Sequence, residues 1–404
     1  MRIGIDCRTI LNPGLGEYAG VGHYTYLLVK HLLEIDKENE YVLFFDYRMS
    51  DVGEFEQANV KVWRFPFSQY QKFLPFSYSH MLITAMILKT RLDVFHSPAN
   101  VLPLSYPGRS VITIHDLAIY RNPEWFPGQL FSTRLLVPQS VRKARHIIAV
   151  SESTKRDLKD IFHVPSSKIS VVYEAPFVVP INVKDRNVNT VKKFKIQCPY
   201  FLFLGTIDPR KNIRMLVAAF LKLRANPLFA NHQLVIAGGK GYKADDILES
   251  VEQHRAEGVH YVGYLTHNEK LDLVRRSLCF VFPSLYEGFG LPVLEAMRMG
   301  VPVITSNTSS LPEVAGNAAV LVDPTSMQAL RSAMARIATN GVLRTNLVRR
   351  GYEQAKKFQW EDVARKTLAI YQNVGRRNSA KKAKRTKPSK VQKQRKNNNR
   401  RRRK

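Results

Sequence analysis

The stretch Tyr286-Glu-Gly-Phe-Gly-Leu-Pro-Val-Leu-Glu295 decides how the rest of the sequence is interpreted. It follows the apolar run Cys279–Pro283, which predicts a buried strand. Gly288 and Gly290 allow close approach of a ligand to the backbone, and the proline at 292 suits the first turn of a helix. We therefore expect a strand, a tight loop, and a helix from Leu291 whose free N–H groups face the loop.

Two carboxylates flank this loop, Glu287 within it and Glu295 in the first turn of the expected helix. Ionised carboxylates only accept hydrogen bonds, so each suits the hydroxyl groups of a sugar. The alternative is local: Glu295 interacts only with the helix dipole, and Glu287 only caps a neighbouring group.

Outward from this stretch, short apolar runs alternate with helical patterns, which is typical of parallel α/β architecture. The expected strands are Arg2–Asp6, Tyr41–Asp46, Val60–Trp63, Asp93–His96, Ser110–His115, His146–Val150, Ile169–Tyr173, Tyr200–Gly205, Gln233–Gly238, Val259–Gly263, Cys279–Pro283, Val301–Ser306 and Ala319–Val322. They form two series of similar size, separated by a polar, irregular segment. We therefore expect an α/β protein with two Rossmann-like, doubly wound domains and a cleft between them.

The predicted organisation has five parts. It comprises an acceptor-side domain at 1–178, a linker at 179–199, a nucleotide-sugar-binding domain at 200–357, a helix crossing back to the first domain at 358–375 and a disordered polybasic tail at 376–404. Doubly wound sheets bind ligands beyond the carboxyl ends of their strands, so the loops that follow strands carry the information about function.

Three of these loops hold chemistry-bearing residues. Arg210 and Lys211 lie between a strand and a helix that begins near Asn212, a position suited to an anionic group such as a diphosphate, although two solvated surface cations would look the same. His115 and Asp116 end a strand of the first domain, where a histidine binds a hydroxyl, stabilises charge or is purely structural. Gly22 belongs to a glycine-containing turn after the first strand, which is either an incomplete phosphate-binding pattern or a plain glycine-rich turn.

Composition narrows the class of protein. The 404 residues include three scattered cysteines, which fits a reducing compartment, and no apolar run of about 18 residues that would span a membrane. No secretory signal is visible, so we expect a cytoplasmic protein. No Asp-x-Asp pair occurs, so we expect no metal and no cofactor, with cations and helix ends neutralising the leaving group.

The net charge of +29 is unevenly placed. Residues 376–404 hold 16 Lys or Arg and no acid; subtracting them leaves +13 on the first 375 residues. The tail suits an anionic membrane surface and, as a weaker alternative, nucleic acid, and it also fits a solvated segment without a fixed partner. We expect peripheral association with the inner face of the cell membrane. The aromatic-rich stretch from Phe65 to Leu88 is either a second membrane-facing surface or part of the core.

Taken together, these motifs resemble the family-4 retaining glycosyltransferases of GT-B fold over residues 1–374. The resemblance rests on Glu287–Glu295, on Pro-Arg-Lys-Asn at 209–212, on His115-Asp116 and on Leu311-Pro-Glu-Val-Ala-Gly316. A departure is Gly205-Thr206, where many members carry Gly-Arg; Arg210 would replace the missing arginine.

The resemblance also implies roles for individual residues. Arg210 and Lys211 would hold the donor diphosphate, Glu287 the donor sugar and Glu295 the ribose. Backbone groups at Gly288, Phe289, Gly290 and Leu291 would support sugar and phosphate, with Gly22 approaching from the other domain and His115 near the reacting carbon.

The implied reaction is retaining, metal-independent hexosyl transfer to a saccharide or lipid-linked saccharide in cell-surface polysaccharide synthesis. The mannosyltransferase-like form of the motif favours GDP-mannose as the donor. The alternatives are another GT-B enzyme, such as a nucleotide-sugar epimerase or a phosphorylase, and a catalytically inactive nucleic-acid-binding protein that uses the basic tail.

Overall fold

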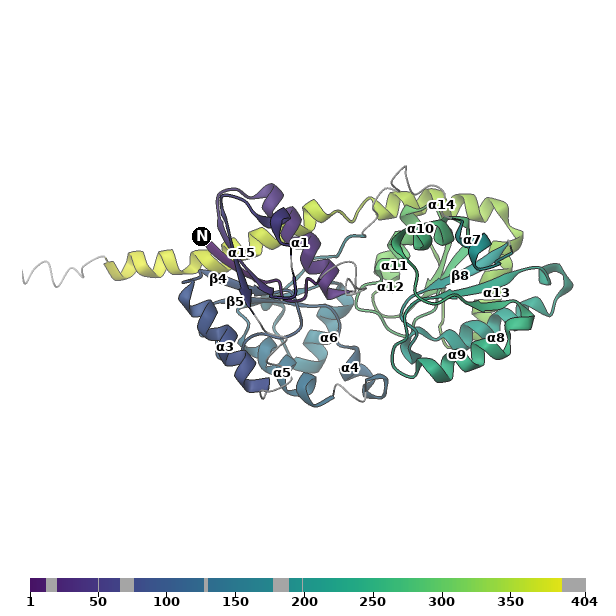
Figure 1. Ribbon diagram of the computed structural model, residues 1–404, viewed down its shortest axis with the longest axis horizontal. Helices are drawn as coiled ribbons and strands as arrows, with labels where there is room; N and C mark the ends of the chain where they lie inside the picture. Colours follow the sequence, from purple (N-terminus) through teal and green to yellow (C-terminus); the bar gives the residue numbers. More distant parts are fainter. Residues whose placement is uncertain are drawn as a thin grey trace, which may run out of the picture.

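The chain folds into two lobes, each built on one parallel sheet (Figure 1). The computed structural model describes residues 1–11, 20–49, 51–65, 76–126, 130–176, 189–197 and 199–386. Within the stretch Phe65–Leu88, residues 66–75 therefore lie outside the described residues. The last 18 positions of the basic tail, 387–404, lie outside them as well.

The first lobe contains a seven-stranded sheet with the order β3-β2-β1-β4-β5-β6-β7. Its strands are β1 (Arg2–Asp6), β2 (Glu40–Asp46), β3 (Val60–Phe65), β4 (Val94–Ser97), β5 (Ser110–Ile114), β6 (His146–Ala149) and β7 (Ile169–Val171). Each pair of neighbouring strands in this sheet is parallel. The central strands are buried along their length because helices cover both faces, which explains their continuous apolar runs.

Two layers of helices cover this sheet. Helix α1 (Val21–Ile35) lies on one face, and α3 (Phe76–Lys89), α5 (Leu130–Lys143) and α6 (Glu152–Phe162) lie on the other (Figure 1). The short helix α4 (Ala118–Arg121) follows β5. Helix α1 begins at Val21, so the sequence-predicted Gly22 lies in its first turn.

The second lobe contains a six-stranded sheet with the order β10-β9-β8-β11-β12-β13. Its strands are β8 (Tyr200–Leu204), β9 (Gln233–Ala237), β10 (Val259–Tyr261), β11 (Cys279–Phe282), β12 (Val303–Ser306) and β13 (Val320–Val322). The order reverses beside β8, as in a Rossmann-like sheet. The two parallel sheets with their helical layers confirm the predicted fold of two Rossmann-like domains.

Helices enclose the second sheet as they do the first. They are α7 (Thr190–Lys193), α8 (Ile213–Arg224), α9 (Ala244–Gln253), α10 (His267–Arg276), α11 (Leu291–Arg298), α12 (Leu311–Ala315), α13 (Met327–Thr339) and α14 (Gly341–Ala355). Helix α7 falls within the range expected as linker, and the Thr190 N–H donates to Asp272 Oδ2 at 2.8 Å. This part of the segment is therefore attached to the second lobe.

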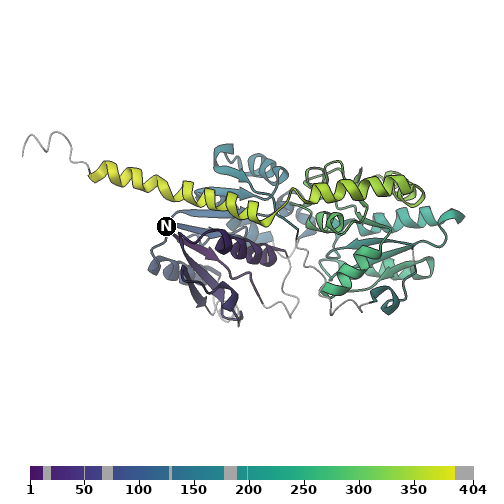
Figure 2. The ribbon, with the colours of Figure 1, turned by 90° about the horizontal axis from the view of Figure 1, so that it is seen from above.

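The last helix, α15 (Trp360–Thr386), leaves the second lobe and runs across α1 to the far end of the first lobe (Figure 2). Its Tyr371 hydroxyl lies 2.6 Å from His96 Nδ1, and Arg109 Nη1 donates to the carbonyl oxygens of Val374 and Gly375 at 2.9 and 2.7 Å. The helix continues to Thr386, past residue 376 where we expected disorder. Ala, Lys and Arg are good helix formers and need no core to extend an anchored helix.

The helices in the described part of the chain include none whose length and apolar character would let it cross a membrane.

Candidate active site

Arg210, Lys211 and Glu287 form one buried cluster, although they are 76 or 77 positions apart in the chain. The two cations lie in the 3-10 turn Pro209–Lys211 after β8, and Glu287 lies in the loop after β11. Arg210 Nη1 donates to Glu287 Oε2 at 2.7 Å, and Lys211 Nζ donates to Oε1 at 2.5 Å. The parallel strands β8 and β11 are neighbours, so their following loops meet at one edge of the sheet.

Burial and ion pairing together set the pKa values of the side chains in this cluster. Lys211 is 7% exposed and Glu287 is 8% exposed. Burial raises the pKa of the Glu287 carboxyl, but Lys211 and Arg210 outweigh it and hold this pKa at about 2. Burial also lowers the pKa of Lys211, against the attraction of Glu287. Glu287 is therefore fully ionised at neutral pH.

Arg210 retains hydrogen-bonding capacity within this cluster. Its Nε atom is buried and has no hydrogen-bond partner among the residues that the structure describes. Asp208 Oδ2 lies 3.7 Å from Arg210 Nη2, beyond hydrogen-bond distance, and burial raises the pKa of this carboxyl. An unused guanidinium donor in a buried, polar site suits an anionic ligand.

The loop around Glu287 is fixed by two serines that precede α12. The Glu287 N–H donates to Ser309 Oγ at 2.9 Å, and Ser310 Oγ lies 2.9 and 2.7 Å from the carbonyl oxygens of Glu287 and Phe289. Gly290 has a φ of 116°, in the left-handed region, and directly precedes α11. Helix α11 therefore begins at Leu291, four residues after Glu287.

Gly288 brings the two lobes into direct contact. A Cβ atom at this position would lie 1.9 Å from the carbonyl oxygen of His115 and 2.8 Å from Asp116 Cβ. The Gly288 carbonyl oxygen accepts from Ser151 Oγ at 2.6 Å. The two sequence-predicted loops, one from each lobe, therefore meet backbone to backbone.

His115 lies on the first-lobe side of this contact, with both ring nitrogens facing acceptors. Nδ1 is 2.8 Å from Glu174 Oε1, and Nε2 is 2.7 Å from the Pro98 carbonyl oxygen. Burial lowers the pKa of His115, but Glu174 outweighs it, so the pKa is raised above 6.5. Both nitrogens can donate only in the imidazolium form, so the geometry and the pKa both indicate a charged ring. Asp116 Oδ1 accepts from the Ala118 N–H at 3.0 Å.

Glu295 contacts a different cation from Glu287. Lys270 of α10 donates to Glu295 Oε2 at 2.5 Å, and the Glu295 side chain is 12% exposed. His23, in the first turn of α1, is also affected by Lys270. Burial, followed by repulsion from Lys270 and His267, lowers the pKa of His23 to about 4. The start of α1 at His23 therefore lies close to α10, the helix that carries Lys270 and His267.

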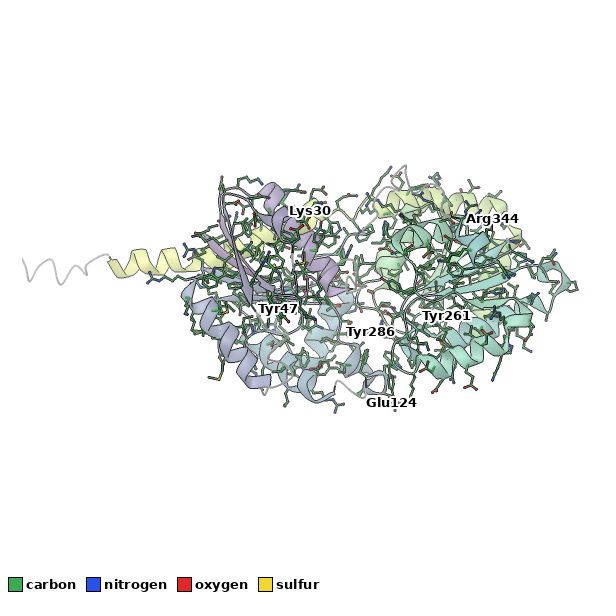
Figure 3. The ribbon with its side chains drawn as sticks, viewed as in Figure 1. Lys30, Tyr47, Glu124, Tyr261, Tyr286 and Arg344 are labelled. Atoms are coloured by element: carbon green, nitrogen blue, oxygen red, sulfur yellow. The ribbon has the colours of Figure 1, made fainter. Side chains whose placement is uncertain are left out.

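Sequence reasoning missed Glu174, and it did not predict the partners of two residues at the lobe interface, Tyr286 and Glu313. Glu174 follows β7 by three positions, and its place at a strand end was the available signal. The Tyr286 hydroxyl donates to Asp157 Oδ2 of α6 at 2.5 Å, and Tyr286 lies where the lobes meet (Figure 3). Glu313 of α12 accepts from the N–H groups of Glu152 and Ser153 at 2.9 Å each. This last carboxylate caps a helix of the opposite lobe.

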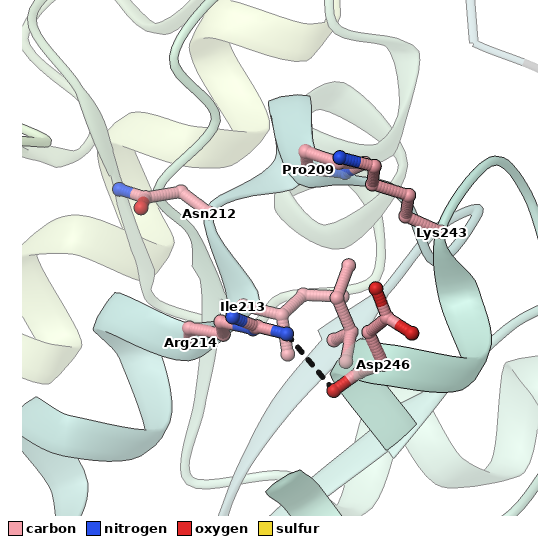
Figure 4. A pocket seen from close by; sticks show the side chains of 7 residues that line it. Pro209, Asn212, Ile213, Arg214, Lys243 and Asp246 are labelled. Carbon is pink, nitrogen blue, oxygen red and sulfur yellow. Dashed lines mark hydrogen bonds between the residues drawn. The ribbon is translucent and has the colours of Figure 1, made fainter. Parts of the chain in front are cut away.

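A pocket of about 320 Å³ lies behind the Pro209–Lys211 turn (Figure 4). Its lining residues are Pro209, Asn212, Ile213, Arg214, Lys243, Asp246 and Ile247. Arg214 Nη2 donates to the Asp246 carbonyl oxygen at 3.0 Å across one side of it. The described residues hold no group of three or more His, Cys, Asp or Glu side chains placed to bind a metal ion.

Comparison with protein families gives two matches that together span most of the chain. The model described as Glycosyltransferase Family 4 matches residues 18–175, and that described as Glycosyl transferases group 1 matches residues 187–354. The two matches correspond to the two lobes.

Similar curated proteins include two from Escherichia coli. O-antigen chain mannosyltransferase B is 30% identical over 368 residues, covering 87% of this chain and 95% of that protein. Serotype-specific mannosyltransferase WbdA is 30% identical over 275 residues, covering 64% of this chain but only 32% of that longer protein.

Solved structures with the same fold include sucrose-phosphate synthase from Thermosynechococcus elongatus and WaaG, a glycosyltransferase involved in lipopolysaccharide biosynthesis. The former has a TM-score of 0.69 at 20% identity and covers 92% of this chain and 98% of its own. The latter has a TM-score of 0.67 at 13% identity and covers 91% and 99%.

Proposed function

The chain belongs to the family-4 glycosyltransferases of GT-B fold, and from that premise we propose that it transfers mannose from GDP-mannose to a saccharide or lipid-linked saccharide acceptor, with retention of configuration. The proposal places the donor on the second lobe and the acceptor on the first. The similarity to O-antigen mannosyltransferases supports the choice of mannose and of a cell-surface polysaccharide.

The observation that carries the proposal is the buried cluster of Arg210, Lys211 and Glu287. The two cations share one carboxylate, so their positive charge is only partly neutralised. A diphosphate beside them would bond to the unused Arg210 Nε donor and share Lys211, which frees Glu287 to accept hydrogen bonds from sugar hydroxyls. The cluster is therefore suited to bind both halves of a sugar nucleotide.

The chemistry follows from where charge develops. Cleavage of the bond between the anomeric carbon and the diphosphate gives an oxocarbenium-like sugar and a departing anion. Arg210, Lys211 and the N–H group of Leu291 stabilise that anion in a buried site, where hydrogen bonds and charges act more strongly than in water. Phe289 and Gly290 hold the loop that aims these groups, and Glu295 with Lys270 lies at the far end to contact the ribose.

His115 supplies charge from the first lobe. Its ring nitrogens are bonded to Glu174 and Pro98, so it acts as a fixed imidazolium beside the transferred sugar rather than as a free hydroxyl acceptor. Asp116 lies next to it and contacts the Gly288 loop. Closure of the lobes on the donor would exclude water and so limit hydrolysis.

Retention is proposed through substitution on the same face of the sugar. A double displacement needs a free carboxylate nucleophile on the face opposite the leaving group. Glu287, Glu295 and Glu174 each accept from a basic side chain, and Asp116 accepts from a backbone N–H. This arrangement favours same-face transfer, which we propose to be metal-independent.

The test is a transfer assay with the purified full chain, a panel of labelled sugar nucleotides and mannose-terminated oligosaccharide acceptors. We expect acceptor-dependent consumption of GDP-mannose and an α-linked product by NMR. Donor conversion without acceptor would instead indicate an epimerase, and binding of RNA with no donor binding would indicate the nucleic-acid alternative.

A matched pair of variants links the assay to the site. Arg210→Gln should reduce turnover at least about a hundredfold, because one oxyanion-stabilising donor contributes on that order. Arg336→Gln changes an exposed arginine of α13, outside the site, and should leave turnover unchanged. Equal activity of the two variants would contradict the assigned role of Arg210.

A further inference from the structure

A large basic groove lies on the first lobe at the edge of the sheet opposite to the candidate site. Its volume is about 920 Å³, and it is lined by residues that precede β5, β6 and β7 and by two residues of α15. Its basic lining residues are Arg109, Arg142, Lys143, Arg145, His146 and Lys168, and none of the described residues that line it is acidic. Because the strands are parallel, these positions share the amino-terminal edge, whereas His115 lies at the carboxyl edge.

The positive charge of the groove is not neutralised by the protein. Arg142, Lys143 and Arg145 are exposed, and none forms a salt bridge within the described part of the chain. Lys168 Nζ donates to the carbonyl oxygens of Val141 and Arg142, at the end of α5, at 2.8 Å each. Burial, followed by repulsion from Arg145, lowers the pKa of Lys168. Several like charges are thus held together without a counterion, which favours a ligand that supplies several negative charges.

The groove is continuous with the basic end of the chain. Asn373 and Val374 line it, and Arg109 holds the carbonyl oxygens of Val374 and Gly375. From Arg376 onward the sequence is rich in Lys and Arg. The basic segment of the chain therefore begins directly beside the groove, where α15 is anchored.

Exposed apolar side chains occur on the neighbouring helices. Met81 and Leu88, seven positions apart on one face of α3, are 61% and 49% exposed, and Leu135 of α5 is 48% exposed. Helices α3 and α5 lie on the same side of the sheet (Figure 1). Their last residues, Lys89 and Lys143, precede strands β4 and β6, so both helices end towards the amino-terminal edge of the sheet. Cations beside exposed apolar side chains are typical of a surface that binds lipid headgroups and contacts the acyl boundary.

We propose that this groove binds the phosphate groups of anionic phospholipids and so docks the first lobe, end-on, to a membrane surface. The clustered cations favour a ligand with phosphate groups. The exposed apolar side chains favour a lipid as the source of those phosphates, because a nucleic-acid backbone would not contact them. The five residues of β5, at about 3.3 Å each, separate the groove from the candidate site by roughly 17 Å. A docked enzyme would keep its donor side turned away from the lipid.

The test measures binding of the full chain to vesicles and needs no sugar substrate, so it stands apart from the proposed transfer reaction. Vesicles of phosphatidylcholine with phosphatidylglycerol are compared with vesicles of phosphatidylcholine alone, by flotation. The groove variant Arg142→Gln/Lys143→Gln/Arg145→Gln should bind the anionic vesicles on the order of a hundredfold more weakly than the parent chain, since each cation near the surface contributes about fivefold. Equal binding by the parent and this variant would overturn the proposal.

Matched controls separate the groove from net charge and from other ligands. Lys30→Gln/Arg275→Gln/Arg349→Gln removes the same charge from exposed positions outside the groove and should bind vesicles like the parent chain. Met81→Ala/Leu88→Ala should weaken vesicle binding and leave binding of poly(U) RNA unchanged. A groove variant that loses RNA binding but keeps vesicle binding, or that changes only the response of its thermal midpoint to inorganic phosphate, would overturn the lipid assignment. An unchanged thermal midpoint and circular dichroism spectrum of the groove variant check that its fold is intact.

Discussion

The carbonyl oxygen of His115 lies 1.9 Å from the position that a Cβ atom would occupy on Gly288. These residues belong to different lobes, and each follows a central strand of its sheet, β5 and β11. Only a residue without a side chain permits this approach. The contact joins the loop that carries Glu287 to the loop that carries His115, so the relative position of the two lobes at the candidate site depends on a glycine.

We therefore predict that Gly288→Ala separates the lobes without unfolding them. The added methyl group meets a backbone carbonyl, which cannot move aside as a flexible side chain would. We expect a larger radius of gyration by small-angle X-ray scattering, at least tenfold slower transfer, and a loss of about 1–3 kcal/mol of stability. Gly341→Ala is the control, because its nearest neighbour is Arg344 Nη2 at 3.5 Å. An unchanged scattering curve and rate for Gly288→Ala would contradict the interpretation.

The strands could be predicted from the sequence because the signal is local. Each expected run of apolar residues became a strand, with ends shifted by two residues or fewer; Val301–Ser306, for example, is observed as Val303–Ser306. Parallel strands buried on both faces need continuous apolar residues, and short turns separate them from helices, so the pattern is visible without tertiary information.

The direction in which a side chain points was harder to predict from the sequence than the strands were. Asn212 occupies the N-cap position of α8 as predicted, but its side chain does not cap the helix. Its φ of 60° turns the side chain away, and Nδ2 donates to the carbonyl oxygens of Pro283 and Pro324 at 3.2 and 2.7 Å. The amide thus fixes the turn that carries Arg210 and Lys211, a role that depends on residues distant in the sequence.

The pairs of residues that contact each other at the lobe interface could not be predicted from the sequence. Motifs identified Tyr286 and the segment around Glu313 as notable, but their partners, Asp157 and the start of α6, depend on how two separately folded units meet. Glu174 carries a strand-end signal, but nothing local links it to His115, which lies 59 positions earlier.

The second prediction concerns the charge of Glu287. Its pKa is about 2 in the folded protein against an ordinary value of 4.5, so ionised Glu287 contributes stability that is complete above pH 4.5 and is lost as the pH falls toward 2. Glu287→Gln leaves Arg210 and Lys211 without their anion and should cost about 3 kcal/mol at neutral pH. Urea denaturation should show this gap shrinking in acid.

The exposed pair of Glu353 and Lys356 provides the control for that measurement. Glu353→Gln should leave the free energy of unfolding within error of the parent chain, because exposed ion pairs contribute little. If Glu287→Gln were equally neutral at all pH values, the cluster would not be held together by charge.

The third prediction concerns His115 and Glu174. The folded pKa of His115 is raised above 6.5, so the stability that its charge contributes is complete below pH 6.5 and is lost as the pH rises through the folded value. Glu174→Gln removes the main cause of this shift. We expect the ring proton resonance of His115 to titrate at lower pH in the variant, and the stability gap between parent and variant to be largest below pH 6.5. A gap that widens toward alkaline pH would contradict the imidazolium assignment.

The fourth prediction concerns Glu313, whose two carboxylate oxygens accept from the N–H groups of Glu152 and Ser153 at 2.9 Å each and so cap α6 from the opposite lobe. Glu313→Ala removes an anion from a helix N-terminus, which costs about 0.5–2 kcal/mol. Because the cap comes from the second lobe, the loss should act on lobe association: the amides of residues 152 and 153 should exchange hydrogen faster, while those in the middle of α6 keep their protection. Asp323→Asn is the control, since Asp323 accepts the Thr325 N–H at 2.8 Å within one lobe, and it should leave exchange in α6 unaltered. If instead the whole of α6 lost protection in Glu313→Ala, the carboxylate would support the fold of the first lobe and not the contact between the two.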